Sequence, residues 1–429
     1  MYRMTYQWIG STVLAFIASI LIGNYWNNWP VDLSALYFAA HFYQIGAHDL
    51  VYAPGGEMFW KHAPAEWQAL AAAHGRPDAL VPAFVYPPIW AKLLGPITQH
   101  VGFIAFSNIV LVLFVLSLVA SISLSFAIGR RLVAENHGKM PSFLIWCVIG
   151  GYAAGFTSVG ALSLQLLQPQ IIVTFLLILM LFLLLSGNDI LAGATLALAA
   201  AIKLMPAMLV IFLVMERRWS ALAAFIAIGI MLGLGSVLVV GWPLHQALID
   251  RLASLDSEIL VSRLSIGVEL VLYHLHQLWQ GSVIWQINQP SMVDQPAVNA
   301  FLSRFVFVLG LLGVWLLTRV APIITRMWTR FLGVYLLVVV SSPLAWLHYL
   351  LLPILMIPAI IGVWNKRWLH VLLIVIGALM SLPVFLWLVD VFWAGYVQVY
   401  LHFGLAVAFL LLSLRVATHR PADLIQGLR

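Results

Sequence analysis

Residues 189–219 read DILAGATLALAAAIKLMPAMLVIFLVMERRW, and this stretch decides the fold class of the chain. Between residues 190 and 215 the only charged side chain is that of Lys203. Runs of about 20 such apolar residues are typical of helices that cross a lipid bilayer. Because Pro206 lacks a backbone N–H, the run favours two short helices that meet at Lys203. One continuous helix is the alternative.

The composition of the whole chain extends this pattern. Hydrophobic residues make up 63% of the sequence and charged residues 8%, whereas about 25% of the residues in a soluble domain are charged. Apolar runs recur almost without interruption, which indicates one membrane domain over residues 1–429. The net charge of +6 comes from scattered basic residues, a pattern that predicts no nucleic-acid partner. The single cysteine, Cys147, excludes a disulfide framework.

Apolar segments of helical length can be placed along most of the chain. We therefore predict an all-α polytopic membrane protein with about 12 transmembrane segments, two of them too short to span alone. The segments lie at residues 8–25, 103–128, 142–164, 169–186, 189–203, 205–215, 219–241, 301–318, 328–342, 346–363, 368–389 and 397–415.

The distribution of lysine and arginine predicts the orientation, because short cytoplasmic loops hold most of these residues in membrane proteins. If the break at Lys203 is a turn, one orientation places most of the 21 lysines and arginines in the cytoplasm. A single helix would move Arg217 and Arg218 outside, so we predict the turn, with both termini cytoplasmic. The residues assigned to the cytoplasmic side are Arg3, Arg130, Arg131, Lys139, Arg217, Arg218, Arg319, Arg326, Arg330, Lys366, Arg367, Arg415, Arg420 and Arg429.

This topology places two long loops on the outer face, at about residues 26–102 and 242–300. The cytoplasmic connections are all short, so we expect any chemistry on the outer, periplasmic face. In the first loop, WPVDLSALYFAAHFYQIG (29–46) and EWQALAAAHG (66–75) predict amphipathic helices along the membrane surface. Residues 8–26 lack a small-residue cleavage site, which predicts an uncleaved anchor.

Ionisable residues at the ends of apolar segments are candidates for function, because a buried charge is unfavourable in hydrocarbon. Asp32 is a candidate general base, although its local sequence favours a helix N-cap. Lys203 is a candidate phosphate ligand, with a lysine that extends to the interface as the alternative. His348 lies in SSPLAWLHYLLLP. It either orients a carboxylate, contacts a phosphate, or makes a structural hydrogen bond.

The second loop and the segment after it add two further candidates. Arg263 and Arg304 have the side chain suited to bidentate phosphate contacts. His274 and His276 are two positions apart, which fits no common zinc pattern, so we expect no metal. The sequence contains no GxxxxGK[ST] motif and no GxGxxG motif that opens a helix. We therefore expect no cofactor, and energy must arrive with the substrate or from an ion gradient.

Five stretches occur in one order between about residues 31 and 355. They are Asp32 with LYFAAHFYQIGAHDLVYAP, then FVYPPIWAKLLGPI, QLLQPQ, LAGATLALAAAIKLMPAMLVIFLVMERRW and SSPLAWLHYLLLPIL. In this order they resemble glycosyltransferase family 87, membrane enzymes that include bacterial polyprenyl-phosphate-mannose-dependent mannosyltransferases. The resemblance implies a C-type glycosyltransferase architecture.

The resemblance also implies a reaction. A sugar such as mannose would move with inversion from a polyprenyl-phosphate donor to a glycolipid or polysaccharide acceptor, at the outer face of a bacterial inner membrane. By position, Asp32 matches the family's loop carboxylate and is the implied base, while Lys203 and His348 match its conserved-element lysine and histidine. Gln168-Pro169-Gln170 stands where the family often has a Gly-Gln pair, which leaves the donor sugar open. A phosphate leaving group needs no protonation, so no metal is demanded.

Two other classes of protein remain open at this point. A secondary transporter or lipid-linked-sugar flippase would also have many spans, but should place ionisable residues at mid-membrane and show paired halves. A polysaccharide ligase or polymerase would share the outer site and join preassembled glycans. The charges at the outer interface favour the transferase.

Overall fold

The computed structural model describes residues 2–52, 63–255, 257–282, 284–364, 366–391 and 394–418. Helices dominate these residues, and each apolar segment predicted from the sequence lies in one or more helices. The protein is a helical, polytopic membrane protein, as predicted. Arg420 and Arg429, which were assigned to the cytoplasmic side, lie outside the described residues.

Six of the described helices are long and apolar enough to cross a bilayer. The helices α7 and α8 are bent by 120° at a short break, and they form either a broken seventh span or a re-entrant loop. The remaining apolar segments form shorter or broken helices, so the number of about 12 spans stays a prediction. The six are α1 (Tyr2–Tyr25), α5 (Phe103–Glu135), α11 (Trp219–Val240), α14 (Ala297–Thr318), α15 (Ile323–Val340) and α20 (Gly395–Thr418). The others are α6 (Phe143–Gly155), α7 (Ser158–Gln165), α8 (Gln170–Leu185), α9 (Asp189–Ile202), η2 (Met205–Leu209), α10 (Val210–Met215), η3 (Leu347–Leu350), α16 (Leu351–Met356), α17 (Pro358–Val363), α18 (Arg367–Leu379) and α19 (Leu382–Asp390).

The predicted break at Lys203 is present. Helix α9 ends at Ile202, and Lys203 has an extended backbone with φ −137° and ψ 137°. Pro206 then lies in the first turn of η2, where its missing N–H leaves no helical hydrogen bond unmade. The two short helices therefore replace one continuous span, and Lys203 is left at their junction.

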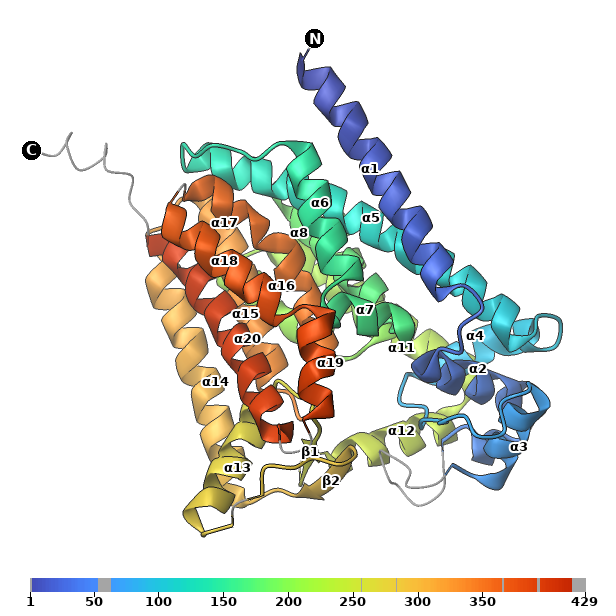
Figure 1. The fold of residues 1–429 in the computed structure, drawn as a ribbon. Coiled ribbons are helices and arrows are strands. Elements are labelled where there is room, and N and C mark those ends of the chain that lie inside the picture. The colour runs from blue at the N-terminus through green and yellow to red at the C-terminus, as the bar shows by residue number, and fades with distance from the viewer. Residues whose placement is uncertain are drawn as a thin grey trace, which may run out of the picture.

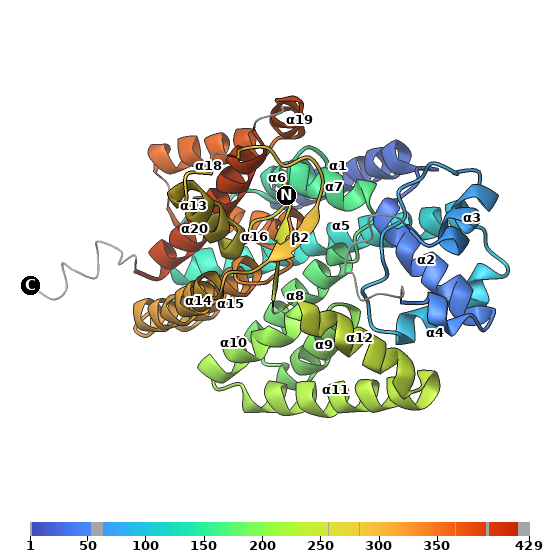
Figure 2. The same ribbon diagram turned by 90° about the horizontal axis from the view of Figure 1, so that it is seen from below.

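Burial separates an interior helix from a peripheral one. In the apolar stretch of α15, 83% of the residues are buried inside the protein, whereas in that of α11 the share is 6%. Few residues of α11 are therefore fully buried, half-buried residues alternate with exposed ones along it, and it lies at the edge of the molecule in Figure 2. It is attached through α9, where Gly193 lies against the backbone carbonyl of Ala221 and leaves no room for a side chain.

Both long loops gather at one end of the molecule, which we call the loop end, while the N-terminus of α1 and the C-terminus of α20 lie at the opposite, terminal end (Figure 1). In the second loop, strands β1 and β2 pair antiparallel with Glu258 opposite Asp294. The elements of the first loop are α2 (Val31–Gln44), η1 (His48–Leu50), α3 (Ala65–Ala73) and α4 (Ile89–Thr98), and those of the second are α12 (Trp242–Ser254), β1 (Glu258–Val261), α13 (Val268–Trp279) and β2 (Ser291–Asp294).

Helices α2 and α3 form at the two sequences predicted to be helical in the first loop. Helix α2 differs from the expected surface helix, because it is buried around most of its circumference. Its Phe38 packs edge-to-face on Trp67 of α3, and Gly95 of α4 lies so close to Gln44 that a side chain there would require the Gln44 side chain to move. These contacts pack the middle and the end of α2 against α3 and α4.

The terminal end is held by buried ion pairs. The side chain of Glu216, at the end of α10, is 1% exposed and pairs with Arg326 at 3.2 Å and Arg330 at 3.0 Å. Arg330 also donates to the hydroxyl of Thr318 at 2.8 Å. Glu135 caps α15 by accepting the backbone N–H of Thr325 at 2.7 Å. The short connections at this end are therefore cross-linked by the ion pairs of Glu216 and by the hydrogen bonds of Glu135.

Candidate functional site

Asp32 lies in the first turn of α2, and two hydrogen bonds between Asn27 and Asn108 fix the chain before it. Asn27 has a left-handed backbone with φ 61°. Its backbone N–H donates to the side-chain oxygen of Asn108 at 2.9 Å, and the Asn108 amide donates back at 2.8 Å. The N-cap of α2 is Pro30, and no side chain caps this helix. The N-cap interpretation of Asp32 is therefore wrong, and its half-buried carboxylate points to a different partner.

That partner is Gln168, in the reversal between α7 and α8. Leu167 adopts φ 46°, and the Gln168 backbone N–H donates to Ser163 at 2.9 Å. The side chain is 6% exposed, and its amide nitrogen donates a hydrogen bond to Oδ2 of Asp32. The sequence pointed to Gln168 only as a departure from a family pattern, because nothing local reveals a contact across 136 positions.

Lys203 completes the bridge from the other side. Its Nζ donates to Oε1 of Gln168 at 3.1 Å and lies 3.4 Å from Nε2 of His348. The ammonium also lies 5.1 Å from the ring centroid of Tyr349. On α4, the Trp90 indole donates to the carbonyl of Ala201 at 2.8 Å, which holds the end of α9 in place. The first loop thus positions Lys203 as well as Asp32.

His348 lies in η3 and is 7% exposed. When Lys203 is charged its ammonium has no acceptor, so Nε2 of His348 then accepts from Lys203 and the neutral ring carries its proton on Nδ1. The Tyr335 hydroxyl donates to the carbonyl of Tyr349 at 2.7 Å, and Leu347 donates to the carbonyl of Leu264 at 2.7 Å. Helix α15 and the second loop therefore fix the turn that carries the imidazole.

Burial and one nearby cation set the electrostatics of Asp32. Burial raises the pKa of this carboxyl to about 6, and the charge of Lys203 opposes that rise. Tyr86, in the segment before α4, is also buried beside Asp32, and both burial and that carboxylate raise its phenol pKa. Tyr86 is anchored because its carbonyl accepts the Tyr52 hydroxyl at 2.6 Å. A carboxylate with a pKa near 6 has the proton affinity of a general base close to neutral pH.

The structure thus joins Asp32 to Lys203 through Gln168, and His348 joins them through Lys203. The model of one protein family, Glycosyltransferase family 87, matches residues 84–345, which is more than half of the chain. The chain belongs to glycosyltransferase family 87. Comparison with curated proteins gives no match. The family 87 match contains Gln168 and Lys203, while Asp32 and His348 lie outside it and join the site through the contacts described above.

The two predicted arginines lie apart from this bridge. Arg263 donates to the carbonyls of Ile287 at 2.8 Å and Val389 at 3.1 Å, so it fastens the second loop to α19. Arg304 is exposed on α14. Their contact with a phosphate stays a prediction for this family 87 member, and for Arg263 it would require release of two backbone partners.

No group of three His, Cys, Asp or Glu side chains within the described ranges is arranged to hold a metal ion. Both ring nitrogens of His274 have protein partners, the Tyr400 hydroxyl at 2.8 Å and the Ile284 carbonyl at 2.9 Å. His276 bonds Gln280 at 2.9 Å. The two histidines of the second loop therefore serve different structural contacts.

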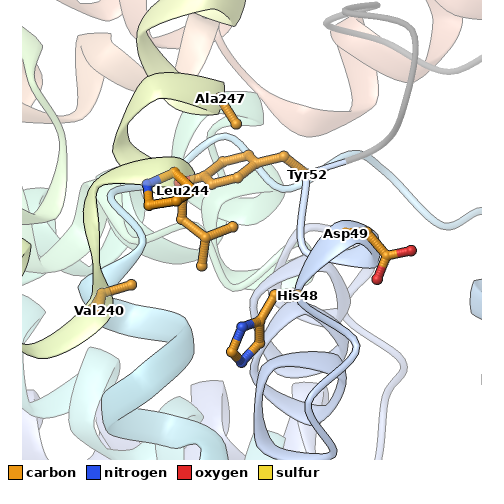
Figure 3. Close-up of a pocket in the computed structure, with 7 residues that line it drawn as sticks. His48, Asp49, Tyr52, Val240, Leu244 and Ala247 are labelled. Carbon is orange, nitrogen blue, oxygen red and sulfur yellow. The ribbon is translucent and has the colours of Figure 1, made fainter.

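A cavity of about 270 Å³ lies between the two loops. The ring of Tyr52 lies beside Leu244 and Ala247 in Figure 3, and the imidazole of His48 approaches from the first loop. The cavity is lined by His48, Asp49, Tyr52, Val240, Pro243, Leu244 and Ala247. Sequence reasoning missed this site, because it forms only where η1 meets the junction of α11 and α12.

Proposed function

We propose that this family 87 glycosyltransferase transfers a hexose or pentose such as mannose, with inversion, from a polyprenyl-phosphate donor to a glycolipid or polysaccharide acceptor. The observation that carries the proposal is the bridge in which Gln168 joins the carboxylate of Asp32 to the ammonium of Lys203. A base and a phosphate-binding cation side by side are what a single displacement at an anomeric carbon requires. The loop end would face the periplasm of a bacterial inner membrane.

In the proposed reaction, Asp32 is the general base. An acceptor hydroxyl gives its proton to the carboxylate as its oxygen forms a bond to the anomeric carbon. The bond from that carbon to the donor phosphate breaks, and its electron pair stays on the phosphate oxygen. The departing phosphate is stable as an anion, so the site needs one base and no general acid.

Lys203 is the proposed ligand of the donor phosphate. Its ammonium has three N–H groups, of which Gln168 and His348 take two. The third remains for a phosphate oxygen. His348 supports this role as a neutral acceptor that orients the ammonium, which favours the orienting assignment over direct contact with phosphate.

The cavity at His48, Asp49 and Tyr52 is the proposed position of acceptor groups remote from the reacting hydroxyl. It combines an aromatic ring, polar side chains and an apolar wall, as sugar-binding surfaces do. Helix α2 separates its His48 end from Asp32 by about 20 Å, given a rise of 1.5 Å per residue over its length. An acceptor that touches both positions is therefore larger than one sugar ring.

The test is whether bond cleavage depends on an acceptor. Purified protein in lipid nanodiscs would be incubated with undecaprenyl-phosphate sugars labelled in the sugar, with and without a bacterial envelope lipid extract. We expect free undecaprenyl phosphate to appear only when the extract is present, together with a labelled glycolipid. Movement of the intact donor across proteoliposomes without cleavage would contradict the proposal and support a flippase.

A further inference from the structure

Gln168 keeps two opposite charges apart. Among the ion pairs between described residues, none joins Asp32 to Lys203. The amide of Gln168 instead donates to the carboxylate and accepts from the ammonium at 3.1 Å. Each charge therefore has a polar neighbour without being neutralised by the other.

The backbone holds this amide in place. Gln168 lies in a reversal with a left-handed residue on one side, Leu167 at φ 46°, and a proline on the other. Its N–H donates to Ser163 at 2.9 Å, and its carbonyl accepts from Ile171 at 3.0 Å. The side chain is buried, so it has little freedom to withdraw from between the two charges.

We propose that Gln168 is a positioning residue that keeps Asp32 and Lys203 from neutralising each other, so that donor phosphate bound at Lys203 strengthens the Asp32 base. This inference rests on the proposed function. An anionic phosphodiester compensates the charge of Lys203, which otherwise stabilises the Asp32 carboxylate. When the bond to the sugar breaks, the phosphate gains a further negative charge, and the proton affinity of Asp32 rises again as the acceptor proton arrives.

The groups around Asp32 agree with this coupling. Lys203 faces the carboxylate from the junction after α9, and Tyr86 faces it from the segment before α4. His348 and Tyr349 on η3 lie behind Lys203. Burial raises the Asp32 pKa to about 6, and the charge of Lys203 opposes that rise. Compensation of the Lys203 charge should therefore raise the Asp32 pKa.

The experiment follows the Asp32 carboxyl by infrared spectroscopy, as the pH-dependent difference between the wild-type protein and Asp32→Asn in nanodiscs. The probe is undecaprenyl phosphate, with undecaprenol as the neutral control. Without the probe, we expect the titration midpoint of the Asp32 carboxyl to lie near pH 6. With undecaprenyl phosphate we expect it to rise by about one pH unit, a tenfold gain in proton affinity, and with undecaprenol to stay unchanged.

Two nearly isosteric substitutions should move this midpoint in opposite directions. In Gln168→Met, Lys203 can approach Asp32 directly, and a contact ion pair outweighs one lost hydrogen bond, so the midpoint falls. In Gln168→Glu, a second carboxylate beside Asp32 raises it. Gln170→Met is the matched control, because Gln170 faces the Tyr335 hydroxyl at 3.4 Å and should leave the midpoint in place.

Unchanged midpoints in both Gln168 variants, or no response of the wild-type protein to undecaprenyl phosphate, would overturn the inference. The titration needs no turnover, so its outcome is separate from that of the transfer assay. If transfer is absent while the midpoint still responds to lipid phosphate, the proposed function fails and the coupling stands. In an active enzyme, Gln168→Met should lower kcat on the order of 10²-fold while the donor KM changes less.

Discussion

The two ends of this molecule use opposite charges in opposite ways. At the terminal end, Glu216 contacts Arg326 and Arg330 directly, at 3.2 and 3.0 Å. At the loop end, Asp32 and Lys203 share an amide and form no direct pair among the described contacts. Fully paired buried charges hold elements together. Charges held apart remain able to act on a substrate, so the geometry of pairing distinguishes a structural cluster from a reactive one.

Helix α15 connects the two ends. Arg330, in its first half, joins the ion cluster, and Tyr335 donates to the carbonyl of Tyr349 beside His348. This helix is also the most buried of the candidate spans. Substitutions at each end should therefore separate stability from activity.

The largest expected effect is that of Asp32→Asn. Loss of the base should reduce transfer by about 10²- to 10⁴-fold, while Asn can still accept the hydrogen bond from Gln168. Activity would be measured as sugar transfer by reconstituted protein, and folding by thermal unfolding in detergent. Substantial remaining transfer would rule out the base assignment.

Glu216→Gln should have the reverse profile. It leaves Arg330, whose side chain is 6% exposed, without a charged partner, and such a loss costs about 3 kcal/mol of unfolding free energy. Thermal unfolding should shift downward while the pH dependence of transfer by the folded fraction stays as in the wild type. An unchanged midpoint of unfolding would show that the ion cluster is not structural.

The pH dependence of transfer should report Asp32. Below its pKa of about 6, the carboxyl is protonated and cannot accept a proton, so kcat/KM should fall about tenfold per pH unit on the acid side. The rate should level off above that pKa until other groups titrate. The residual rate of Asp32→Asn should not fall in this way at acid pH. If it does fall, the acid-side decrease in kcat/KM belongs to a group other than Asp32.

A smaller effect is expected at the cavity between the loops. Ala247→Trp would fill space beside Tyr52 and His48. We expect the acceptor KM to rise about tenfold, since an altered pocket contact changes binding by 1–3 kcal/mol, with the donor KM unchanged. Kinetics with each substrate varied in turn would measure this. A rise in the donor KM instead would move the cavity to the donor side.

The smallest effect should come from the pair of Asp189 and Arg218, in which both side chains are half-buried. Their side chains are 21% and 28% exposed and lie 3.2 Å apart. Asp189→Asn should change the unfolding free energy by about 1 kcal/mol or less, against the larger loss in Glu216→Gln. A comparable loss in both variants would show that burial does not distinguish the two ion pairs.

Local sequence was sufficient to predict the apolar helices and the break between α9 and η2. Apolar composition predicts membrane helices because lipid cannot satisfy polar groups, and Pro206 predicts the end of α9 because it has no N–H. The expected break in residues 189–215 is therefore present. The number of continuous spans could not be predicted in this way, because residues such as Phe156 and Thr157 end α6 through contacts with Ser381 and Leu382 far along the chain.

The sequence by itself determined that the chain lies in a membrane and which apolar segments are helical, since both follow from composition and spacing over a few turns. Only the tertiary structure decided that Asp32 meets Gln168 rather than capping α2, that Lys203 meets the same amide, and that His348 lies against Lys203. These contacts depend on the reversal at Leu167 and on the packing of α2, α9 and η3. Side chains from distant segments meet only after the helices have packed, so no local pattern encodes their contacts.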